Sequence, residues 1–329
     1  MIARILAIFE PFVLALIGTV LLASLLPARG IWVPIMDTVA DAGIVLLFFL
    51  HGAKLSREAI FEGVRAWRLH LATLSVTYVV FPFLGLGFAS LPVMPEVMAA
   101  GILFLTLLPS TVQSSIAFTS IARGNVAAAV CGAAFSNLLG IFLTPLLVAL
   151  FMQKAGVGFS AASLEKILLQ LLLPFVLGHL ARPLIGGFVA RHKTLVGRVD
   201  RTSILLVVYT AFGAAVVEGI WQRVSATDLL LLTLLCSALL ALVLSISMML
   251  GRLLGFSRAD ATVLLFAGSK KSLASGVPMA GVLFPAAQVG LLILPLMLFH
   301  QIQLIVCAVI ARHMGKKADA EAAAEAAVV

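Results

Sequence analysis

The chain has 329 residues, of which 62% are hydrophobic and 11% are charged. Soluble domains carry about 25% charged residues, so this composition excludes an ordinary soluble protein and predicts an all-α polytopic membrane protein. The formal net charge of +8 comes from basic residues spread between apolar blocks, and it does not indicate a nucleic-acid partner.

The apolar residues fall in ten blocks, each about as long as a helix that crosses the bilayer. The first block is too long for the apolar core of a signal peptide, so we expect it to be retained. The three cysteines lie inside such blocks without metal-ligand spacing, which indicates packing residues. We predict ten transmembrane helices at residues 5–27, 33–52, 69–91, 96–121, 125–152, 164–187, 202–222, 227–250, 259–284 and 286–312.

The lysines and arginines between the predicted helices fall mainly on one side of the membrane. Because ten is an even number, both termini lie on the same side, and sixteen of the 22 basic residues lie there with them. Cytoplasmic segments of membrane proteins carry an excess of lysine and arginine, so we expect both termini in the cytoplasm. The four basic residues on the other side are Arg29, Lys154, Lys166 and Arg223.

A short sequence recurs in the two halves of the chain. Pro11-Phe12-Val13-Leu14 in the first predicted helix reappears as Pro174-Phe175-Val176-Leu177 in the sixth. Five helices per repeat is an odd number, so the second repeat is inverted relative to the first, as in many secondary transporters. We predict a first repeat over 1–160, a second over 161–313, and a mobile cytoplasmic tail without apolar periodicity over 314–329.

The first polar cluster lies inside the fourth predicted helix. Pro109 removes a helix hydrogen bond, and the small hydroxyl residues after it can cap a restarted helix. The fifth predicted helix adds a Ser-Asn pair in an otherwise apolar sequence. The candidate substrate-site or ion-site residues of this half are Pro109, Ser110, Thr111, Gln113, Ser114, Ser115, Ser136 and Asn137.

Two adjacent lysines, Lys270 and Lys271, lie near the middle of the ninth predicted helix. A charge at that depth is costly, so chains keep one there mainly for a function. The surrounding glycines and serines indicate that the helix breaks at the lysines, and crossing broken helices form solute sites in transporters. The candidates of this half are Gly268, Ser269, Lys270, Lys271 and Ser272, joined by His300, Gln301 and Gln303 of the tenth helix.

The predicted break has a definite electrostatic character. The carbonyl-rich end of its first half-helix favours a cation, and the N–H-rich start of its second half favours an anion. Ser272 is placed to cap that second half. Adjacent residues on a regular helix point about 100° apart, so Lys270 and Lys271 are not expected to face the same cavity.

Other interpretations of these polar residues remain open. Small polar residues such as Ser136 often line helix contacts only because they allow close packing, and Asn137 or Gln113 can simply bridge helices. A cytoplasmic loop at the lysines would leave flanking helices of about 11 or 12 residues, too short to cross the bilayer. The sequence has no HExxH, no Gly-x-Ser-x-Gly and no paired catalytic carboxylates at depth, so we predict neither an enzyme nor a cofactor. Asp37 and Asp41 lie near the end of the second predicted helix at i, i+4 spacing, where a cation site stays open as an alternative to simple solvation.

The segment from Pro109 to Asn125, which ends in Ala122-Arg123-Gly124-Asn125, resembles helices 4 and 5 of the bile acid:sodium symporter family. The Gly-Ser-Lys-Lys-Ser-Leu and His-Gln-Ile-Gln sequences look more like the branch of sodium/bile acid cotransporter 7 and its bacterial relatives. This resemblance covers nearly the whole chain and implies a bacterial inner-membrane protein in which broken helices 4 and 9 cross. It also implies a panel domain (helices 1, 2, 6 and 7) and a core domain (helices 3–5 and 8–10), with substrate between them.

The chain departs from the family at the residues that bind sodium. The family's Ser-Asn pair corresponds to Ser114 and Ser115, and the glutamate of its Glu-x-Gly-x-Gln-Asn motif corresponds to Phe266. The Gln-Asn pair is replaced by the two lysines, and a sodium ion a few Å from an ammonium is strongly repelled at low dielectric.

These observations predict a secondary transporter of a small organic anion in which a lysine replaces sodium. The sequence leaves three mechanisms open: coupling to sodium, coupling to protons, and uniport without a coupling ion. The alternative is a non-transporting membrane regulator of ion or envelope homeostasis on the same fold. An occluded core without a ligand-sized cavity would favour that alternative.

Overall fold

The fold is that of a computed structural model, which describes residues 11–54, 66–152, 165 and 168–326. Over these residues the protein is entirely helical and has no β-strand. The predicted start of the first helix (5–10), most of the basic link after α3 (55–65) and the last three residues of the tail lie outside the described residues.

Within the described residues, each of the ten predicted segments coincides with one helix or with a series of shorter ones. The elements are α2 (Pro11–Leu25), α3 (Trp32–Lys54), α5 (Trp67–Ser75), the π-helix η1 (Val76–Val80), α6 (Phe81–Ala89), α7 (Glu96–Thr106), α8 (Gln113–Ile121), α9 (Val126–Phe151), the π-helix η3 (Leu168–Leu172), α11 (Leu173–Arg191), α12 (Lys193–Val217), α13 (Ile220–Arg223), α14 (Ala226–Leu253), α15 (Arg258–Gly268), α16 (Leu273–Leu283) and α17 (Ala286–Ala326).

Seven of the described helical stretches are long and apolar enough to cross a membrane. They are Trp32–Lys54, Trp67–Ala89, Val126–Phe151, Leu168–Arg191, Lys193–Val217, Ala226–Leu253 and Ala286–Ala322. The other three predicted segments contain α2, the pair α7 and α8, and the pair α15 and α16, whose individual helices are shorter. Breaks at 107–112 and 269–272 therefore interrupt the fourth and ninth predicted helices, as the sequence indicated.

One predicted link is helical. We expected residues 188–201 to form a basic cytoplasmic connection, but α12 already begins at Lys193 and only His192 separates it from α11. No proline lies between Lys193 and Val217, so nothing stops the helix from extending past the bilayer surface. Its long basic side chains can reach water from a helix as well as from a loop.

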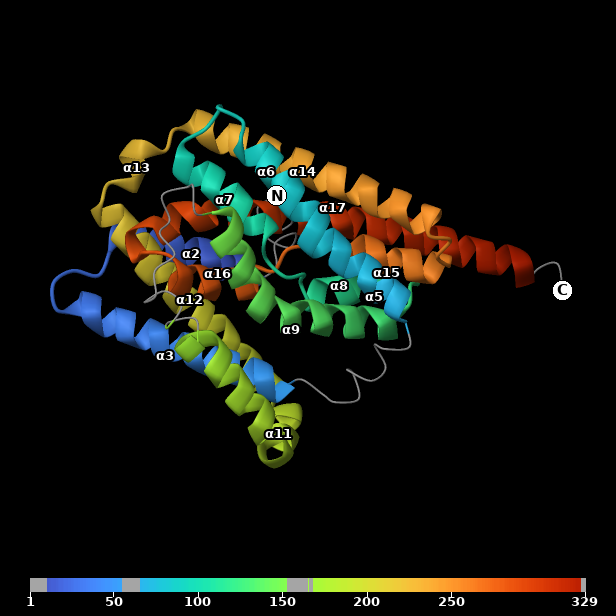
Figure 1. Cartoon of the computed structure of the whole chain (residues 1–329), viewed down its shortest axis with the longest axis horizontal. Coiled ribbons are helices and arrows are strands. Elements are labelled where there is room, and N and C mark those ends of the chain that lie inside the picture. The colour runs from blue at the N-terminus through green and yellow to red at the C-terminus, as the bar shows by residue number, and fades with distance from the viewer. Residues whose placement is uncertain (1–10, 55–65, 153–164, 166–167, 327–329) are drawn as a thin grey trace.

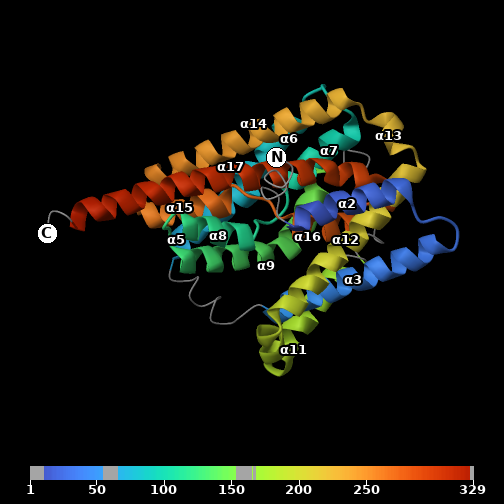
Figure 2. The same ribbon diagram turned by 180° about the vertical axis from the view of Figure 1, so that it is seen from behind.

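The helices form two groups, which Figure 1 shows as a pair of α3 and α11 at lower left and a larger bundle above it. α12 packs against both α2 and α3, and α11 packs along α3. In the larger bundle α17 packs on α7, α8, α14 and α16. The view from behind in Figure 2 shows the same division, and α12 connects the groups through its contacts with α16 and α17.

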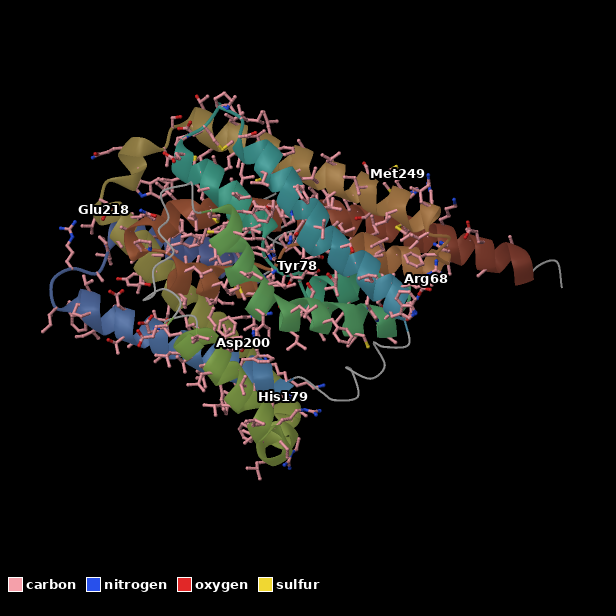
Figure 3. The ribbon with its side chains drawn as sticks, in the orientation of Figure 1. Arg68, Tyr78, His179, Asp200, Glu218 and Met249 are labelled. Atoms are coloured by element: carbon pink, nitrogen blue, oxygen red, sulfur yellow. The ribbon has the colours of Figure 1, made fainter. Side chains whose placement is uncertain are left out.

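The outer surface is apolar along several helices. Leu184 of α11 is 88% exposed and Leu253 of α14 is 74% exposed. Met249, which Figure 3 labels on the outer side of α14, is 56% exposed. Such extensive exposed apolar surface suits lipid and not water.

The predicted tail after Met314 is helical, because α17 continues without interruption to Ala326, and its mobility stays a prediction. Arg123 pairs with Asp319 at 3.0 Å, and Ala318 is buried. Alanine and glutamate are strong helix formers, so an Ala/Glu-rich sequence can extend a helix without an apolar stripe. Both views show this end of α17 projecting beyond the other helices (Figures 1 and 2).

Candidate functional site

The two helix breaks follow from local sequence. Pro109 has no N–H to continue α7, and the chain resumes as a helix at Gln113. α15 ends at Gly268, and the side chain of Ser272 accepts a hydrogen bond from the N–H of Ser275 at 3.1 Å. The predicted cap on the second half-helix is therefore confirmed.

The two breaks are hydrogen-bonded to each other. The N–H of Ser272 donates to the carbonyl oxygen of Pro109 at 2.8 Å. The Ser110 hydroxyl donates to the carbonyl oxygen of Ala267 at 2.5 Å, and the Ser115 hydroxyl donates to that of Phe266 at 3.0 Å. Segments more than 150 residues apart in the chain thus satisfy each other's freed backbone groups.

The Ser136-Asn137 pair of α9 connects both breaks. The Ser136 hydroxyl accepts from the N–H of Ser110 at 2.9 Å. The Asn137 amide nitrogen donates to the carbonyl oxygen of Ser110 at 2.9 Å, while its oxygen accepts from the Ser275 hydroxyl at 2.9 Å. For these two residues, packing and bridging are therefore part of their role, as the alternative interpretation held.

The side chain of Lys271 is fully buried and surrounded by backbone oxygens. Its ammonium donates to the carbonyl oxygens of Thr106 and Leu108 at 2.7 Å each, and to that of Thr77 at 2.8 Å. It also lies 4.1 Å from the ring centroid of Phe81. A lysine ammonium has three donors, so these three carbonyls satisfy it completely.

Gln303 of α17 holds the backbone of Lys271 in place. Its side-chain oxygen accepts from the Lys271 N–H at 3.0 Å, and its side-chain nitrogen donates to the Lys271 carbonyl at 2.9 Å. The same nitrogen lies 2.9 Å from Nδ1 of His300. Gln303 and His300, both predicted site residues, therefore position the second break.

The side chain of Lys270 is also fully buried but has few partners. Among the described residues its ammonium has one hydrogen bond, a long one of 3.5 Å to the Ser114 hydroxyl. It lies 4.1 Å from the ring centroid of Phe118 and 5.4 Å from that of Phe266. The two lysines thus point to different surroundings, as expected for adjacent residues at a break.

Neither lysine has a carboxylate partner within the part of the chain that the structure describes. No group of three or more His, Cys, Asp or Glu side chains suited to a metal occurs there either. Carbonyl dipoles and ring faces therefore provide the stabilisation that a counter-ion would otherwise supply.

A cavity of about 1220 Å³ lies between α3, α11 and α12 on one side and α8, α9, α16 and α17 on the other. Apolar residues such as Phe48, Leu138 and Ile141 line part of its wall. The polar wall residues next to the two breaks are Thr111, Gln113, Ser114, Asn137, Ser272, Ser275, His300 and Gln301. Ser114 and Phe118 line the cavity and contact Lys270, so they separate its ammonium from the open space.

Basic side chains line another part of the same cavity. Asp200 is the acidic residue among the described lining residues, and it pairs with Lys54. Figure 3 shows Asp200 toward α3 and α11, with Tyr78 near the centre of the molecule. The excess of positive charge favours an anion in the cavity. The basic lining residues are Lys54, Arg182, Lys193, Arg201 and Arg312.

Most predicted site residues meet at the crossing of the breaks, but Gln113 and Gln301 stand apart from the hydrogen-bonded network and face the cavity. Sequence reasoning missed Phe118 and the basic lining residues, which it counted only as positive-inside charges. It also missed the carbonyls around Lys271, since every residue has a carbonyl and no sequence pattern distinguishes one. Tyr78, whose hydroxyl donates to the Ser136 carbonyl at 2.5 Å, was detectable as a polar ring inside a predicted span.

Comparison with known proteins agrees with this geometry. Residues 10–316 match the SBF-like CPA transporter family, which is a family of transporters and not of enzymes. The chain is 54% identical over 318 residues to the Escherichia coli (strain K12) protein named "Putative symporter YfeH", covering 96% of each chain.

More distant relatives occur in vertebrates. The chain is 26% identical over 313 residues to sodium/bile acid cotransporter 7-A of Xenopus laevis, covering 92% of this chain and 90% of that one. It is 27% identical over 278 residues to sodium/bile acid cotransporter 7 of Mus musculus, covering 83% and 82%. The resemblance to this branch, drawn from the lysine and His-Gln-Ile-Gln sequences, is therefore confirmed.

Proposed function

Because the chain belongs to the SBF-like CPA transporter family, we propose that it is a secondary transporter of a small organic anion in a bacterial inner membrane. It is an integral membrane protein with several spans, and its relatives are named as a symporter and as sodium/bile acid cotransporters. The observation that carries the proposal is the buried Lys270 ammonium, which lies directly behind two residues of the cavity wall.

The cavity suits an anion with an apolar part. An anionic group near Ser114 would meet hydroxyl and amide groups at one point of the wall and the positive field of Lys270 behind it. The apolar residues of α3 and α9 would contact the rest of the ligand. The basic residues of the cavity would attract the anion from the aqueous side.

We infer transport by alternating access between two domains of an inverted repeat. The panel domain would comprise α2, α3, α11 and α12, and the core domain would contain the remaining spans of a ten-span chain with cytoplasmic termini. The packing of α3 on α11 and α12 supports this division, as does the position of the cavity between the two sets of helices. The matching breaks in α7–α8 and α15–α16 support two repeats.

We infer that Lys270 or Lys271 replaces a coupling sodium ion. Phe266 stands where the resembled family has a glutamate ligand, and both lysine ammoniums lie at the crossing of the breaks. A sodium ion beside them would be repelled in this low-dielectric environment. The expected mechanism is uniport or proton-coupled transport.

The proposal is tested in two stages. A thermal-shift screen of purified protein with acetate, benzoate, cholate and glycerol phosphate identifies a binding anion. Uptake of that anion into proteoliposomes is then measured under a sodium gradient or a proton gradient for the wild type, Lys270→Ala and Lys271→Ala. Lys316→Ala, at an exposed lysine of the α17 extension, is the control and is expected to behave as wild type.

We expect uptake without sodium in the wild type and its loss in Lys270→Ala. Strict sodium dependence that survives both lysine substitutions would contradict the replacement of sodium. The alternative, a non-transporting regulator, predicted an occluded core, and the cavity of about 1220 Å³ argues against it. Absence of uptake of every stabilising anion, with normal binding, would favour the regulator.

A further inference from the structure

The surroundings of the Lys271 ammonium have the composition of a cation site. Its three oxygen partners are backbone carbonyls at 2.7–2.8 Å, contributed by η1 and by the end of α7 and the break after it. The rings of Phe81 and Tyr78 lie 4.1 and 5.9 Å from the nitrogen, on the faces that attract cations. We call these three carbonyls the carbonyl cage.

The Thr77 carbonyl is free to join the carbonyl cage because of the π-helix η1. In this segment the N–H of Phe81 bonds to the carbonyl of Val76, five residues back, and not to that of Thr77. The next donor in the same register, five residues after Thr77, is residue 82, which is a proline without an N–H. The backbone of this helix therefore leaves the Thr77 carbonyl for another donor.

The other two carbonyls are free because α7 ends. Thr106 is the last residue of α7, and the N–H of Ser110, its donor in a continued helix, bonds to the Ser136 hydroxyl. Leu108 lies in the break that precedes Pro109. Carbonyls at a helix C-terminus carry the negative end of the helix dipole, so they favour a positive charge.

The two lysines differ in a way that packing alone does not explain. The carbonyl cage satisfies every donor of Lys271, whereas Lys270 makes one long hydrogen bond among the described residues. An uncharged side chain of equal size would fill the same volume but leave three buried carbonyls without donors. The backbone is thus built around a cation at this position.

We propose that the carbonyl cage is a monovalent-cation site whose resident cation is the chain's own Lys271 ammonium. Once that ammonium is removed, the vacated site binds a small free cation. Methylammonium fits best, because it is smaller than the deleted group and supplies the same N–H donors. This inference deepens one part of the proposed function, the replacement of a sodium ion by a lysine, and it rests on that part only in the choice of cation. Its test measures binding and stability and not transport, so the two proposals can fail separately.

The test is chemical rescue of Lys271→Ala. Melting temperatures are measured in detergent at constant ionic strength in choline, methylammonium, sodium or potassium chloride. Lys271→Ala is expected to melt well below wild type in choline and to recover by about 3 °C or more in methylammonium, with a saturable dose response. The sodium and potassium arms show whether an inorganic ion can replace it.

Two matched variants separate the carbonyl cage from other effects. Lys271→Met keeps the apolar stem and fills the space, so it is expected to be destabilised without rescue. Lys270→Ala leaves the carbonyl cage occupied, so its melting temperature is expected to be the same in all four salts. The proposal is overturned if Lys271→Met is as stable as wild type or if no small cation selectively stabilises Lys271→Ala.

A folding defect in Lys271→Ala does not remove the test. The variant is then expressed as a fusion with a fluorescent protein, and membranes are extracted in each salt. The fraction that elutes as a single symmetric peak on size exclusion is compared between methylammonium and choline. A larger fraction in methylammonium for Lys271→Ala, but not for Lys271→Met, supports the site, and equal fractions overturn it.

Discussion

At the residue scale, two adjacent lysines have different surroundings. The Lys271 ammonium is enclosed by three carbonyls, which connect it to η1, to the end of α7 and to the break after α7. Lys270 lies against the aromatic ring of Phe118, which lines the cavity together with Ser114, so under the proposed function its charge attracts the ligand. One substitution is therefore expected to change stability, and the other binding.

Lys270→Met is expected to weaken anion binding at least about tenfold. The substitution removes a positive charge beside a low-dielectric cavity wall, and the lost attraction to the anion is expected to be about 1.4 kcal/mol or more. The melting temperature without ligand is expected to stay near that of wild type, since a poorly paired buried charge contributes little stability. Thermal-shift titration with the stabilising anion measures both values. Unchanged affinity would show that the anion does not bind beside Lys270.

Gln303→Leu is expected to lower stability by about 1–3 kcal/mol, because it leaves the Lys271 N–H and carbonyl without their side-chain partners. Gln301→Leu is the matched control. The Gln301 side-chain oxygen is buried without a hydrogen-bond partner in the described chain, so its loss is expected to cost little. Equal melting temperatures for the two variants would contradict the positioning role of Gln303.

At the element scale, close helix contacts decide the geometry of the α3–α11 pair. A Cβ on Gly52 of α3 would lie 2.0 Å from the carbonyl oxygen of Phe175, and one on Gly178 of α11 would lie 1.9 Å from that of Phe49. The two glycines thus allow reciprocal backbone contact between α3 and α11, as small residues do in membrane helix pairs.

Gly178→Ala is expected to destabilise the protein by about 1–3 kcal/mol, because α11 must move away from α3 to accommodate a methyl group. Gly187→Ala in the same helix is the control, since the nearest atom to its added Cβ lies 3.9 Å away. Alanine improves helix propensity at both positions, so the difference between their melting temperatures isolates the contact. A smaller decrease in melting temperature for Gly178→Ala than for Gly187→Ala would be inconsistent with this packing.

At the scale of the whole molecule, the C-terminal part of α17 contacts residues near helix ends in both halves of the chain. Asp319 pairs with Arg123 between α8 and α9, and the Arg258 guanidinium at the start of α15 donates to the Met314 carbonyl at 2.7 Å. Gly315 lies so close to α8 that an added Cβ would be 2.2 Å from the Ile121 carbonyl oxygen. The first part of this extension is therefore packed against the larger bundle, and its end projects beyond it (Figures 1 and 2).

Gly315→Ala is expected to lower the melting temperature more than Asp319→Asn. The first change creates a backbone clash that moves α17, whereas the second removes an ion pair whose side chains are 63% and 58% exposed. An exposed pair contributes about 0–1 kcal/mol, and its effect is expected to vanish at high salt. Melting curves at low and high salt measure both decreases in melting temperature. A larger decrease for Asp319→Asn would contradict the greater importance of the Gly315 contact.

The sequence by itself determined the class of protein, the positions of the helical segments and the two breaks. Insertion into a bilayer depends on the local transfer free energy of about 20 residues, and Pro109 and Ser272 act on their own backbone. The candidate site residues at the two breaks were predictable because the breaks themselves follow from local sequence. The helical structure of residues 193–201 and of the tail up to Ala326 was not predicted, since polar helices carry no apolar pattern.

Only the tertiary structure decided which lysine faces which partner. The carbonyls around Lys271 lie 163 to 194 residues before it in the chain, and they are free because of a π-helix, a proline and a helix end. The cavity likewise arises from helices of both groups. Backbone carbonyls and cavities are products of how helices cross, so composition and spacing do not specify them.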